Sequence, residues 1–250
     1  MRAIVLSAGQ GKRLLPLTAE LPKCLLPVGN GQTLLEFQLR TLARCGISRV
    51  AIVSGFGVER VERFLAERRV PGLEIELLFN PFFAVSDNLA TCWVARAAMH
   101  EDFVLANGDT LFEPDVLRRL LGSAPAPITV TIDHKRAYDE DDMKVSLDDD
   151  GRLLGIGKNL KPEFVHGESI GLLCMRGAGV RRFREAVERA MRAPAGLRAW
   201  YLSVVNTLAQ EGVVQTASIR GMWWQEIDSP EDLEDAHRSL AARPRAAAAR

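Results

Sequence analysis

Hydrophobic and polar positions follow a strand–helix rhythm along the first half of the chain. Short β-branched runs predict strands, and apolar residues three or four positions apart, such as Leu34 with Phe37 and Leu39 with Leu42, predict amphipathic helices between them. The predicted elements are a strand at 2–7, a helix at 33–45, a strand at 49–54, a helix at 58–69, a strand at 74–79, a helix at 88–98 and a strand at 102–106. This order favours a mostly parallel sheet with helices on both faces.

The rhythm changes after residue 125, where predicted strands follow one another closely. We expect strands at 127–133, 143–148, 152–157 and 169–175, helices at 177–191 and 200–210, and strands at 214–219 and 223–227. Ser229 and Pro230 are typical of the start of a last helix. The sequence thus predicts an α/β fold, as one large domain or two small ones, in which antiparallel strands are added to a mostly parallel sheet, and a flexible tail over 241–250.

Composition narrows the classes of partner. The 250 residues carry 32 Lys and Arg against 32 Asp and Glu, a balance that argues against nucleic acid or an anionic membrane as the main partner. The cysteines have neither C-x-x-C nor zinc-site spacing, which is typical of reduced thiols in a cytoplasmic protein. We find no signal peptide and no apolar run near about 18 residues, so neither secretion nor a membrane span is expected.

A glycine-rich loop follows the first predicted strand. The apolar run that ends at Leu6 is followed by Gly9-Gln10-Gly11, then by Lys12 and Arg13, and later by Pro22-Lys23. Glycines let backbone N–H groups approach phosphate oxygens, and the cations neutralise their charge. The loop therefore predicts a phosphate-binding site.

Two familiar phosphate loops do not fit this sequence. A dinucleotide fingerprint needs glycine at position 14, which is Leu14, and an acid at the end of the second strand, where Ser54-Gly55 stands. A Walker A loop needs Ser or Thr after Gly11-Lys12, but Arg13 follows.

The remaining pattern is G-x-G-x-R, then Pro16-Leu17-Thr18, then Pro22-Lys23. It resembles the signature loop of the nucleotidyltransferases that join a nucleoside triphosphate to a phosphorylated small molecule. This superfamily includes the sugar-1-phosphate pyrophosphorylases, and the chain is most similar to the phosphocholine, phosphonate and inositol-phosphate cytidylyltransferases. The resemblance implies the nucleotidyltransferase fold: one domain over residues 1–240 with a Rossmann-like three-layer α/β/α arrangement around a central mixed, mostly parallel sheet. Its nucleotide-binding half would span 1–125 and its acceptor-binding half 126–240.

Two acids at predicted strand ends are candidate magnesium ligands. Asp109 ends the strand at 102–106, and Asp228 precedes the last helix. Mg²⁺ prefers carboxylate oxygens and needs only one or two protein acids besides phosphate oxygens. The resemblance assigns the metal to these two positions. The alternative is that each is a turn or cap residue. Glu226 is an alternative to Asp228 as the second metal ligand.

The implied reaction is attack by a substrate phosphate oxygen on the α-phosphorus of the nucleotide. A phosphate monoester has a second pKa of about 6 and is largely dianionic at neutral pH, so no general base is needed. The enzyme would overcome the repulsion between the reacting anions with positive charges, alignment of the two phosphates and a metal ion. Arg13 is suited to grip the β- and γ-phosphates, and by resemblance Lys23 approaches the α-phosphate and the incoming oxyanion. Lys12 either joins them or is a solvated loop lysine.

Binding of the nucleoside involves small residues. Leu6, Ala8 and Gly9 would supply backbone groups and an apolar floor for base and ribose, and Gly11 would bind the nucleotide as part of the phosphate loop. Asn88 stands where sugar-nucleotide enzymes have a glycine in the base-binding loop, and it either contacts the base or caps the helix at 88–98.

Four residues are candidates for the acceptor pocket. Lys144 and Lys158 would receive its phosphate or phosphonate, although Lys144 is equally an exposed strand lysine. Glu168 would pair with an amine or accept from hydroxyls. Trp223, like Trp200, Tyr201 and Trp224, would stack on a choline-like cation or pack in the core. The segment Asp139-Glu140-Asp141-Asp142 is either a solvated loop or closes over the acceptor.

Together these features predict a Mg²⁺-dependent cytidylyltransferase. CTP, or another nucleoside triphosphate, and a small phosphorylated or phosphonylated alcohol or amine would be its partners. The alternatives are a sugar-1-phosphate uridylyl- or thymidylyltransferase and a non-catalytic nucleotide-binding regulator. The sequence leaves the oligomeric state, including a homodimer, open.

Overall fold

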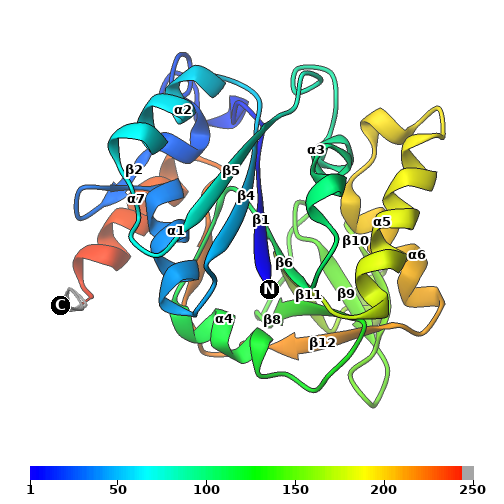
Figure 1. Cartoon of the computed structure of the whole chain (residues 1–250). Coiled ribbons are helices and arrows are strands. Elements are labelled where there is room, and N and C mark those ends of the chain that lie inside the picture. Colours follow the sequence, from blue (N-terminus) through cyan, green and yellow to red (C-terminus); the bar gives the residue numbers. More distant parts are fainter. Residues whose placement is uncertain (244–250) are drawn as a thin grey trace.

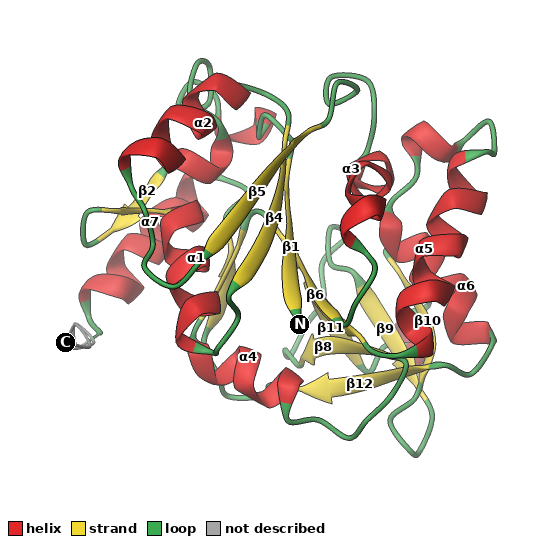
Figure 2. Cartoon of the chain, in the orientation of Figure 1, coloured by secondary structure: helices red, strands yellow, loops and turns green. Residues whose placement is uncertain are grey.

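The computed structural model describes residues 1–243. Its helices form two layers, one on each face of a central sheet (Figure 1, Figure 2). The predicted three-layer α/β fold is confirmed. The sheet order is β10-β9-β11-β6-β1-β4-β5, with β8 paired to β11 and β12. The strands are β1 (Arg2–Ser7), β4 (Arg49–Ser54), β5 (Glu74–Phe79), β6 (Phe103–Asn107), β8 (Ile128–Asp133), β9 (Lys144–Leu147), β10 (Leu153–Gly157), β11 (Gly167–Met175) and β12 (Val214–Ser218).

The sheet is parallel in its first half and largely antiparallel in its second. Strand β1 pairs in parallel with β4 and β6, and β4 pairs in parallel with β5. Strand β11 runs antiparallel to β6, β8 and β9. The carboxyl ends of β1 and β6 therefore open at the same edge, where ligands of such sheets bind, and the amino end of β11 reaches the same edge.

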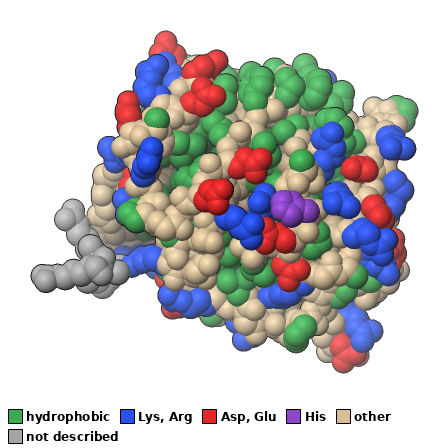
Figure 3. Space-filling view, in the orientation of Figure 1, with side chains coloured by type: hydrophobic (Ala, Val, Ile, Leu, Met, Phe, Trp, Pro, Cys, Tyr) green, Lys and Arg blue, Asp and Glu red, His purple; other side chains and the backbone are tan. Residues whose placement is uncertain are grey.

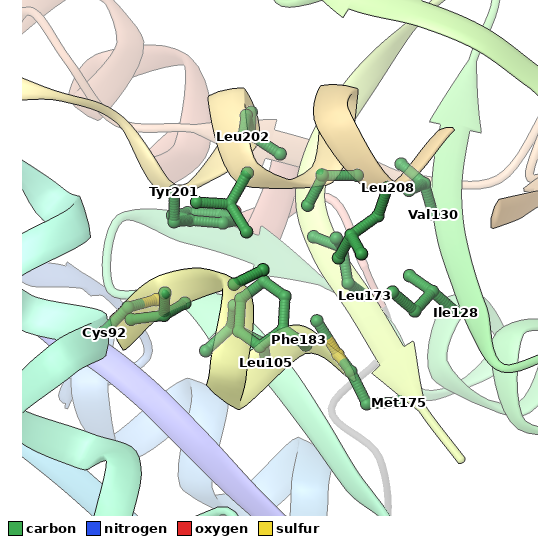
Figure 4. Close-up of a cluster of buried hydrophobic side chains, with 14 of the residues drawn as sticks. Cys92, Leu105, Ile128, Val130, Leu173, Met175, Phe183, Tyr201, Leu202 and Leu208 are labelled. Atoms are coloured by element: carbon green, nitrogen blue, oxygen red, sulfur yellow. The ribbon is translucent and has the colours of Figure 1, made fainter. Parts of the chain in front are cut away.

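The helices are α1 (Leu34–Arg44), α2 (Val58–Glu67), α3 (Asn88–Val94), α4 (Pro114–Leu121), α5 (Ala178–Met191), α6 (Tyr201–Gln210) and α7 (Pro230–Ala241). Helices α1, α2 and α4 bury apolar side chains on one face of the sheet, and α3, α5 and α6 on the other. In Figure 4, Cys92, Phe183 and Tyr201 come from these three helices and pack near Leu105 of β6. Helix α7 packs on a small hairpin formed by β2 (Pro27–Gly29) and β3 (Gln32–Thr33).

The sequence analysis missed two elements that follow Asp109. Strand β7 (Thr110–Phe112) pairs antiparallel with β13 (Trp224–Glu226), and α4 follows directly. Helix α4 has Pro114 in its first turn and is only 8 residues long, so its apolar period is brief. The predicted helix at 88–98 is also shorter: α3 ends at Val94 and a 3₁₀ turn continues to Ala98.

Residues 244–250, most of the predicted tail, lie outside the described residues. Helix α7 ends at Ala241, and Arg243 is held: its Nη1 lies 2.6 Å from Glu113 Oε2 and its guanidinium lies 4.3 Å from the Trp223 ring centroid.

Charged side chains of both signs are interspersed on the face shown in Figure 3. Ion pairs also connect distant parts of the chain: Arg2 Nε, for example, lies 3.2 Å from Glu101 Oε1. Among residues 1–243 no helix has both the length and the apolar character that crossing a bilayer requires.

Candidate active site

The signature loop and the two strand-end acids meet in one pocket of about 310 Å³. Strands β1 and β6 approach closely there: a Cβ on Gly108 would lie 2.2 Å from Ser7 Oγ, so only glycine fits. The predicted residues Leu6, Gly9, Gly11, Lys12, Arg13, Lys23, Asp109 and Asp228 line this pocket, together with Ser7, Cys24 and Gly108. Ala8 is buried beside it, and its carbonyl accepts from Phe56 N at 3.0 Å.

The glycine-rich loop folds back on itself around Gly11. This residue has φ 75°, a left-handed conformation that favours glycine. Its carbonyl oxygen accepts from the Thr18 hydroxyl at 2.8 Å. The aliphatic stem of Lys23 packs against Gly11, so a Cβ added at Gly11 would lie only 3.0 Å from Lys23 Cδ. The loop therefore shapes the path along which Lys23 reaches the pocket.

Lys23 joins the two acids. Its Nζ donates to Asp109 Oδ2 at 2.9 Å and to Asp228 Oδ1 at 2.6 Å. Burial opposes the charge of Lys23, but the two carboxylates outweigh burial and raise its pKa. Arg13 Nη2 donates to Asp228 Oδ2 at 2.6 Å. Residues 215 positions apart thus form one charged centre.

The acids at this centre suit a hard divalent cation. Carboxylate oxygens of Asp109, Glu226 and Asp228 lie within 4.8 Å of one another. Asp109 Oδ1 is buried and has no hydrogen-bond partner among the described residues. Glu226 lies at the exposed side of this group, and local desolvation followed by the negative charges of Asp109 and Asp228 raises its pKa. An oxygen-only ligand set with an unpaired buried acceptor fits Mg²⁺, and the structure brings Glu226 to this centre together with Asp228.

Asp228 is held by the start of α7 without acting as its cap. The Ser229 hydroxyl accepts from Asp232 N at 3.1 Å, and the Asp232 carboxylate accepts from Ser229 N at 2.7 Å, which is a capping box. Asp232 also accepts from Asp228 N at 2.9 Å. Because Ser229 and Asp232 satisfy the helix end, the Asp228 carboxylate is free to face Lys23 and Arg13.

Asp109 lies on a turn that is positioned by Gln38, which the sequence analysis missed, and by Tyr201, which it considered only for stacking or core packing. The Gln38 side chain, from α1, donates to the carbonyl oxygens of Asn107 at 2.7 Å and Thr110 at 2.8 Å, so it spans the turn that carries Asp109. The Tyr201 hydroxyl donates to Asn107 Oδ1 at 2.9 Å. One sequence signal for Gln38 existed: it is a polar residue among the apolar positions of the helix predicted at 33–45.

Asn88 does not cap the helix that it begins, which corrects one of the two expectations for this residue. Asn88 Oδ1 accepts from Tyr201 N at 2.9 Å, so it caps the first turn of α6 rather than its own helix. Helix α3 begins after Asp87, whose side chain makes no capping bond. Asn88 therefore ties α3 to α6 at the edge where the sheet opens.

Lys144 is not the exposed strand lysine that was one expectation. It is 8% exposed, and its ammonium donates to the carbonyl oxygens of Asp139 and Lys158, the latter at 3.0 Å. The pairing of β9 with β10 and β11 buries its stem and leaves only backbone acceptors within reach. It joins the loop before β9 to the end of β10.

Lys158 and Glu168 lie on the wall that was assigned to the acceptor. Lys158 Nζ lies 2.8 Å from Asp141 Oδ1 and 4.9 Å from the Trp200 ring centroid. Glu168 is 4% exposed, and its Oε2 lies 2.9 Å from Lys135 Nζ. Burial raises the pKa of Glu168 to about 7 although Lys135 opposes the shift.

The structure does not bring Trp223 to this wall. Its ring lies 6.2 Å from that of Phe37, and its backbone N–H donates to Glu113. The antiparallel pairing of β13 with β7 places Glu226 opposite Thr110, next to Asp109. Trp223 precedes the other end of β13 and therefore lies away from the pocket. Trp200 is the tryptophan that contacts a predicted acceptor residue.

The acidic segment contacts both halves of the site. Asp141 Oδ2 accepts from Arg13 Nη1 at 3.1 Å, and Asp141 Oδ1 accepts from Lys158 at 2.8 Å. The bond to Lys158 and its charge lower the pKa of Asp141. Asp139, Glu140 and Asp141 are exposed, which agrees with the expectation of a solvated loop, and closure over the acceptor stays a prediction.

Comparisons with known proteins point in one direction. Residues 3–210 match the family described as the MobA-like NTP transferase domain. The chain is 33% identical to the CMP-5'-(3-aminopropyl)phosphonate synthase of Streptomyces rubellomurinus, over 94% of this chain and 38% of that protein. It is 27% identical to the bifunctional IPC transferase and DIPP synthase of Aquifex aeolicus, over 95% of this chain and 51% of that protein. The chain thus spans about half, or less, of these relatives.

A solved structure supports the fold. The inositol-1-phosphate CTP transferase of T. maritima aligns with a TM-score of 0.77 at 23% identity, covering 92% of this chain and 90% of that one. The resemblance to the nucleotidyltransferases that the sequence motifs indicated is confirmed.

Proposed function

The chain belongs to the family of MobA-like NTP transferase domains, and on this premise we propose that it is a Mg²⁺-dependent cytidylyltransferase. It would transfer CMP from CTP to a small phosphorylated or phosphonylated alcohol or amine and release pyrophosphate. Phosphocholine, 2-aminoethylphosphonate and inositol-1-phosphate represent the acceptor types. The names of the relatives favour cytidylyl transfer over the sugar-1-phosphate uridylyl or thymidylyl alternative.

One observation carries the proposal. Lys23 lies between Asp109 and Asp228, with Arg13 on the far side of Asp228, at the end of a glycine-rich loop. A binding module needs cations for phosphates, but it does not need two further acids facing them. The arrangement therefore favours a catalyst over a non-catalytic nucleotide binder.

The chain's residues would divide the work by charge. Backbone groups of Gly9 and Gly11 would approach the phosphates, and Arg13 would bind the β- and γ-phosphates through its planar fork. Lys23 would neutralise the α-phosphate and the incoming oxyanion, because its raised pKa keeps it charged. Asp109 and Asp228 would hold Mg²⁺, which shields phosphate charge when bound.

The acceptor would enter from the wall of β9 to β11. Its phosphoryl or phosphonyl oxygen is already an anion near neutral pH, so the chain has only to align it with the α-phosphorus. Lys158 and Arg13 both donate to the Asp141 carboxylate, which links the acceptor wall to the nucleotide loop. The division of the chain into nucleotide and acceptor halves at residue 125 remains a prediction.

Pyrophosphate release tests this function. The chain is offered CTP, UTP, dTTP and ATP, each with Mg²⁺ and a panel of phosphomonoesters and phosphonates. Turnover with CTP and an amino, choline or inositol acceptor is the expected result. Turnover only with UTP or dTTP and a hexose phosphate would establish the alternative, and nucleotide binding without pyrophosphate from any pair would contradict catalysis.

A further inference from the structure

The Lys23 ammonium is bonded to oxygens that the proposed metal would use. It donates to Asp109 Oδ2 at 2.9 Å and to Asp228 Oδ1 at 2.6 Å. Carboxylate oxygens of these two acids and of Glu226 lie within 4.8 Å of one another. Mg²⁺ takes carboxylate oxygens at about 2.0–2.1 Å. An ion bound to the same two aspartate oxygens leaves no room for the ammonium between them.

Arg13 supplies a second cation to the same acids. Its Nη2 donates to Asp228 Oδ2 at 2.6 Å, so both oxygens of Asp228 accept from a positively charged donor. Lys23 and Arg13 are also the residues to which the proposed function assigns the phosphates of the nucleotide. The two side chains bring the acids the same positive charge as one Mg²⁺ ion, so replacing them with the metal leaves this charge unchanged.

Lys23 alone does not satisfy the acids. Asp109 Oδ1 is buried and has no hydrogen-bond partner within residues 1–243. A buried acceptor without a partner costs free energy. A cation that takes several oxygen ligands at once can satisfy more of these carboxylate oxygens than a single ammonium can. The ammonium is therefore a partial substitute for the metal.

The Lys23 side chain can leave the acids while its backbone stays in place. Leu25 N donates to the Pro22 carbonyl oxygen at 2.8 Å, and the Pro22 ring packs on Gly57, where a Cβ would lie 2.6 Å from Pro22 Cγ. The stem of Lys23 lies against Gly11 of the phosphate loop. Because a lysine stem is flexible, rotation about its bonds moves the ammonium between the acids and this loop.

We propose that Lys23 is an internal competitor of the metal: its ammonium holds Asp109 and Asp228 together until Mg²⁺ binds their oxygens, and this binding releases Lys23 to the phosphates. The inference rests on the proposed function and deepens it, because it couples metal entry to the placement of the lysine that faces the α-phosphate. Mg²⁺ alone is then a weak ligand. The nucleotide strengthens metal binding by giving Lys23 a new anionic partner, and the coupling is reciprocal.

Opposite effects of one variant on two ligands test the exchange. Lys23→Met keeps the apolar stem and removes the charge. Calorimetry of the whole chain with Mg²⁺ alone should show at least roughly tenfold tighter metal binding, because two charge-assisted hydrogen bonds no longer compete. A non-hydrolysable CTP analogue at saturating Mg²⁺ should bind at least roughly tenfold more weakly, because the phosphates lose a cation.

Lys12→Met is the matched control, because it removes the same charge from an exposed lysine that lines the same pocket. Solvent screens an exposed charge, so this variant should tighten Mg²⁺ by no more than about twofold. Equal tightening by Lys12→Met and Lys23→Met would show that the overall positive charge of the pocket, rather than exchange with Lys23, limits metal binding. That result would overturn the inference.

Two other results would also overturn it. Unchanged Mg²⁺ affinity in Lys23→Met with weaker nucleotide binding would make Lys23 a phosphate ligand only. Weaker binding of both ligands would make it a structural residue. Neither measurement needs turnover, so absence of pyrophosphate release would contradict the proposed function without touching this result, and unchanged Mg²⁺ affinity would leave catalysis standing.

Melting temperatures keep the test valid if the variant is unstable. Lys23→Met leaves two acids without their cation, so it should melt at a lower temperature than wild type when Mg²⁺ is absent. Added Mg²⁺ should raise its melting temperature by more than that of wild type, because tighter binding stabilises the folded state more. Lys23→Gln, which keeps a neutral donor, is the second variant, and an equal Mg²⁺ response of wild type and both variants would contradict the exchange.

Discussion

The proposed nucleotide side of the site is held by helices, strands and the turns between them, whereas the proposed acceptor side is contacted by an exposed loop. Asp109 stands on a turn bridged by Gln38, and Asp228 precedes a capping box. On the other side, Asp141 meets Arg13 and Lys158 through side chains that are 69%, 59% and 27% exposed. In the proposed reaction, the charges that align the phosphates come mainly from the first side, whereas those that meet the acceptor belong to more exposed side chains.

The largest expected effect is on the nucleotide side. Lys23→Ala should lower turnover by at least roughly 10²–10³, because it removes the cation nearest to both acids. The fold should persist, since Asp109 and Asp228 can still bind Mg²⁺. Pyrophosphate release and thermal melting with Mg²⁺ measure the two effects, and Lys12→Ala, an exposed neighbour in the loop, should cost far less. Near-normal turnover of Lys23→Ala would remove the role assigned to it.

The next largest effect concerns Glu168, on the wall assigned to the acceptor. Burial raises the pKa of Glu168 from 4.5 to about 7, so between these values the folded chain binds more protons than the unfolded chain. Its contribution to stability is therefore lost as pH rises from 4.5 to about 7. Relative to Glu168→Gln, the wild-type free energy of unfolding should fall by on the order of 3 kcal/mol between pH 4 and pH 8.

Urea unfolding of both proteins across this pH range is the measurement. Parallel pH profiles for wild type and Glu168→Gln would show that the buried carboxylate does not titrate in this range.

A smaller effect is expected where the nucleotide side is supported. Gln38→Leu keeps the volume but leaves the carbonyl oxygens of Asn107 and Thr110 without their donor, which should cost about 1–3 kcal/mol of stability. If Gln38 positions Asp109, the half-saturating Mg²⁺ concentration should also rise several-fold, as when groups behind a metal ligand are lost. A loss of stability with an unchanged Mg²⁺ requirement would make Gln38 a structural residue only.

The smallest effect is expected on the loop side. Asp141→Asn weakens an exposed ion pair, which is typically worth no more than about 1 kcal/mol, so the acceptor KM should fall by no more than about fivefold. Steady-state kinetics with 3-aminopropylphosphonate measures this, and Asp139→Asn in the same loop is the comparison. A rise in acceptor KM would mean that Asp141 helps the acceptor to bind.

The sequence by itself determined the elements that depend on short-range patterns. The spacing of Gly11, Arg13 and Lys23 indicated the phosphate loop, and strand-end positions indicated Asp109 and Asp228. The order of strands and helices indicated the layered fold, apart from the short elements β2, β3, β7 and α4, whose patterns are too brief to read. These signals are local, because a strand end or a glycine turn is encoded by its own few residues.

Only the tertiary structure decided which distant side chains meet. It placed Trp200 rather than Trp223 beside Lys158, turned Lys144 onto backbone carbonyls, and used Asn88 to cap α6. It also brought Asp141 to Arg13 across 128 positions. Such contacts depend on strand register and on how loops close over the sheet, and a shift of one residue along a strand would turn each side chain to the other face.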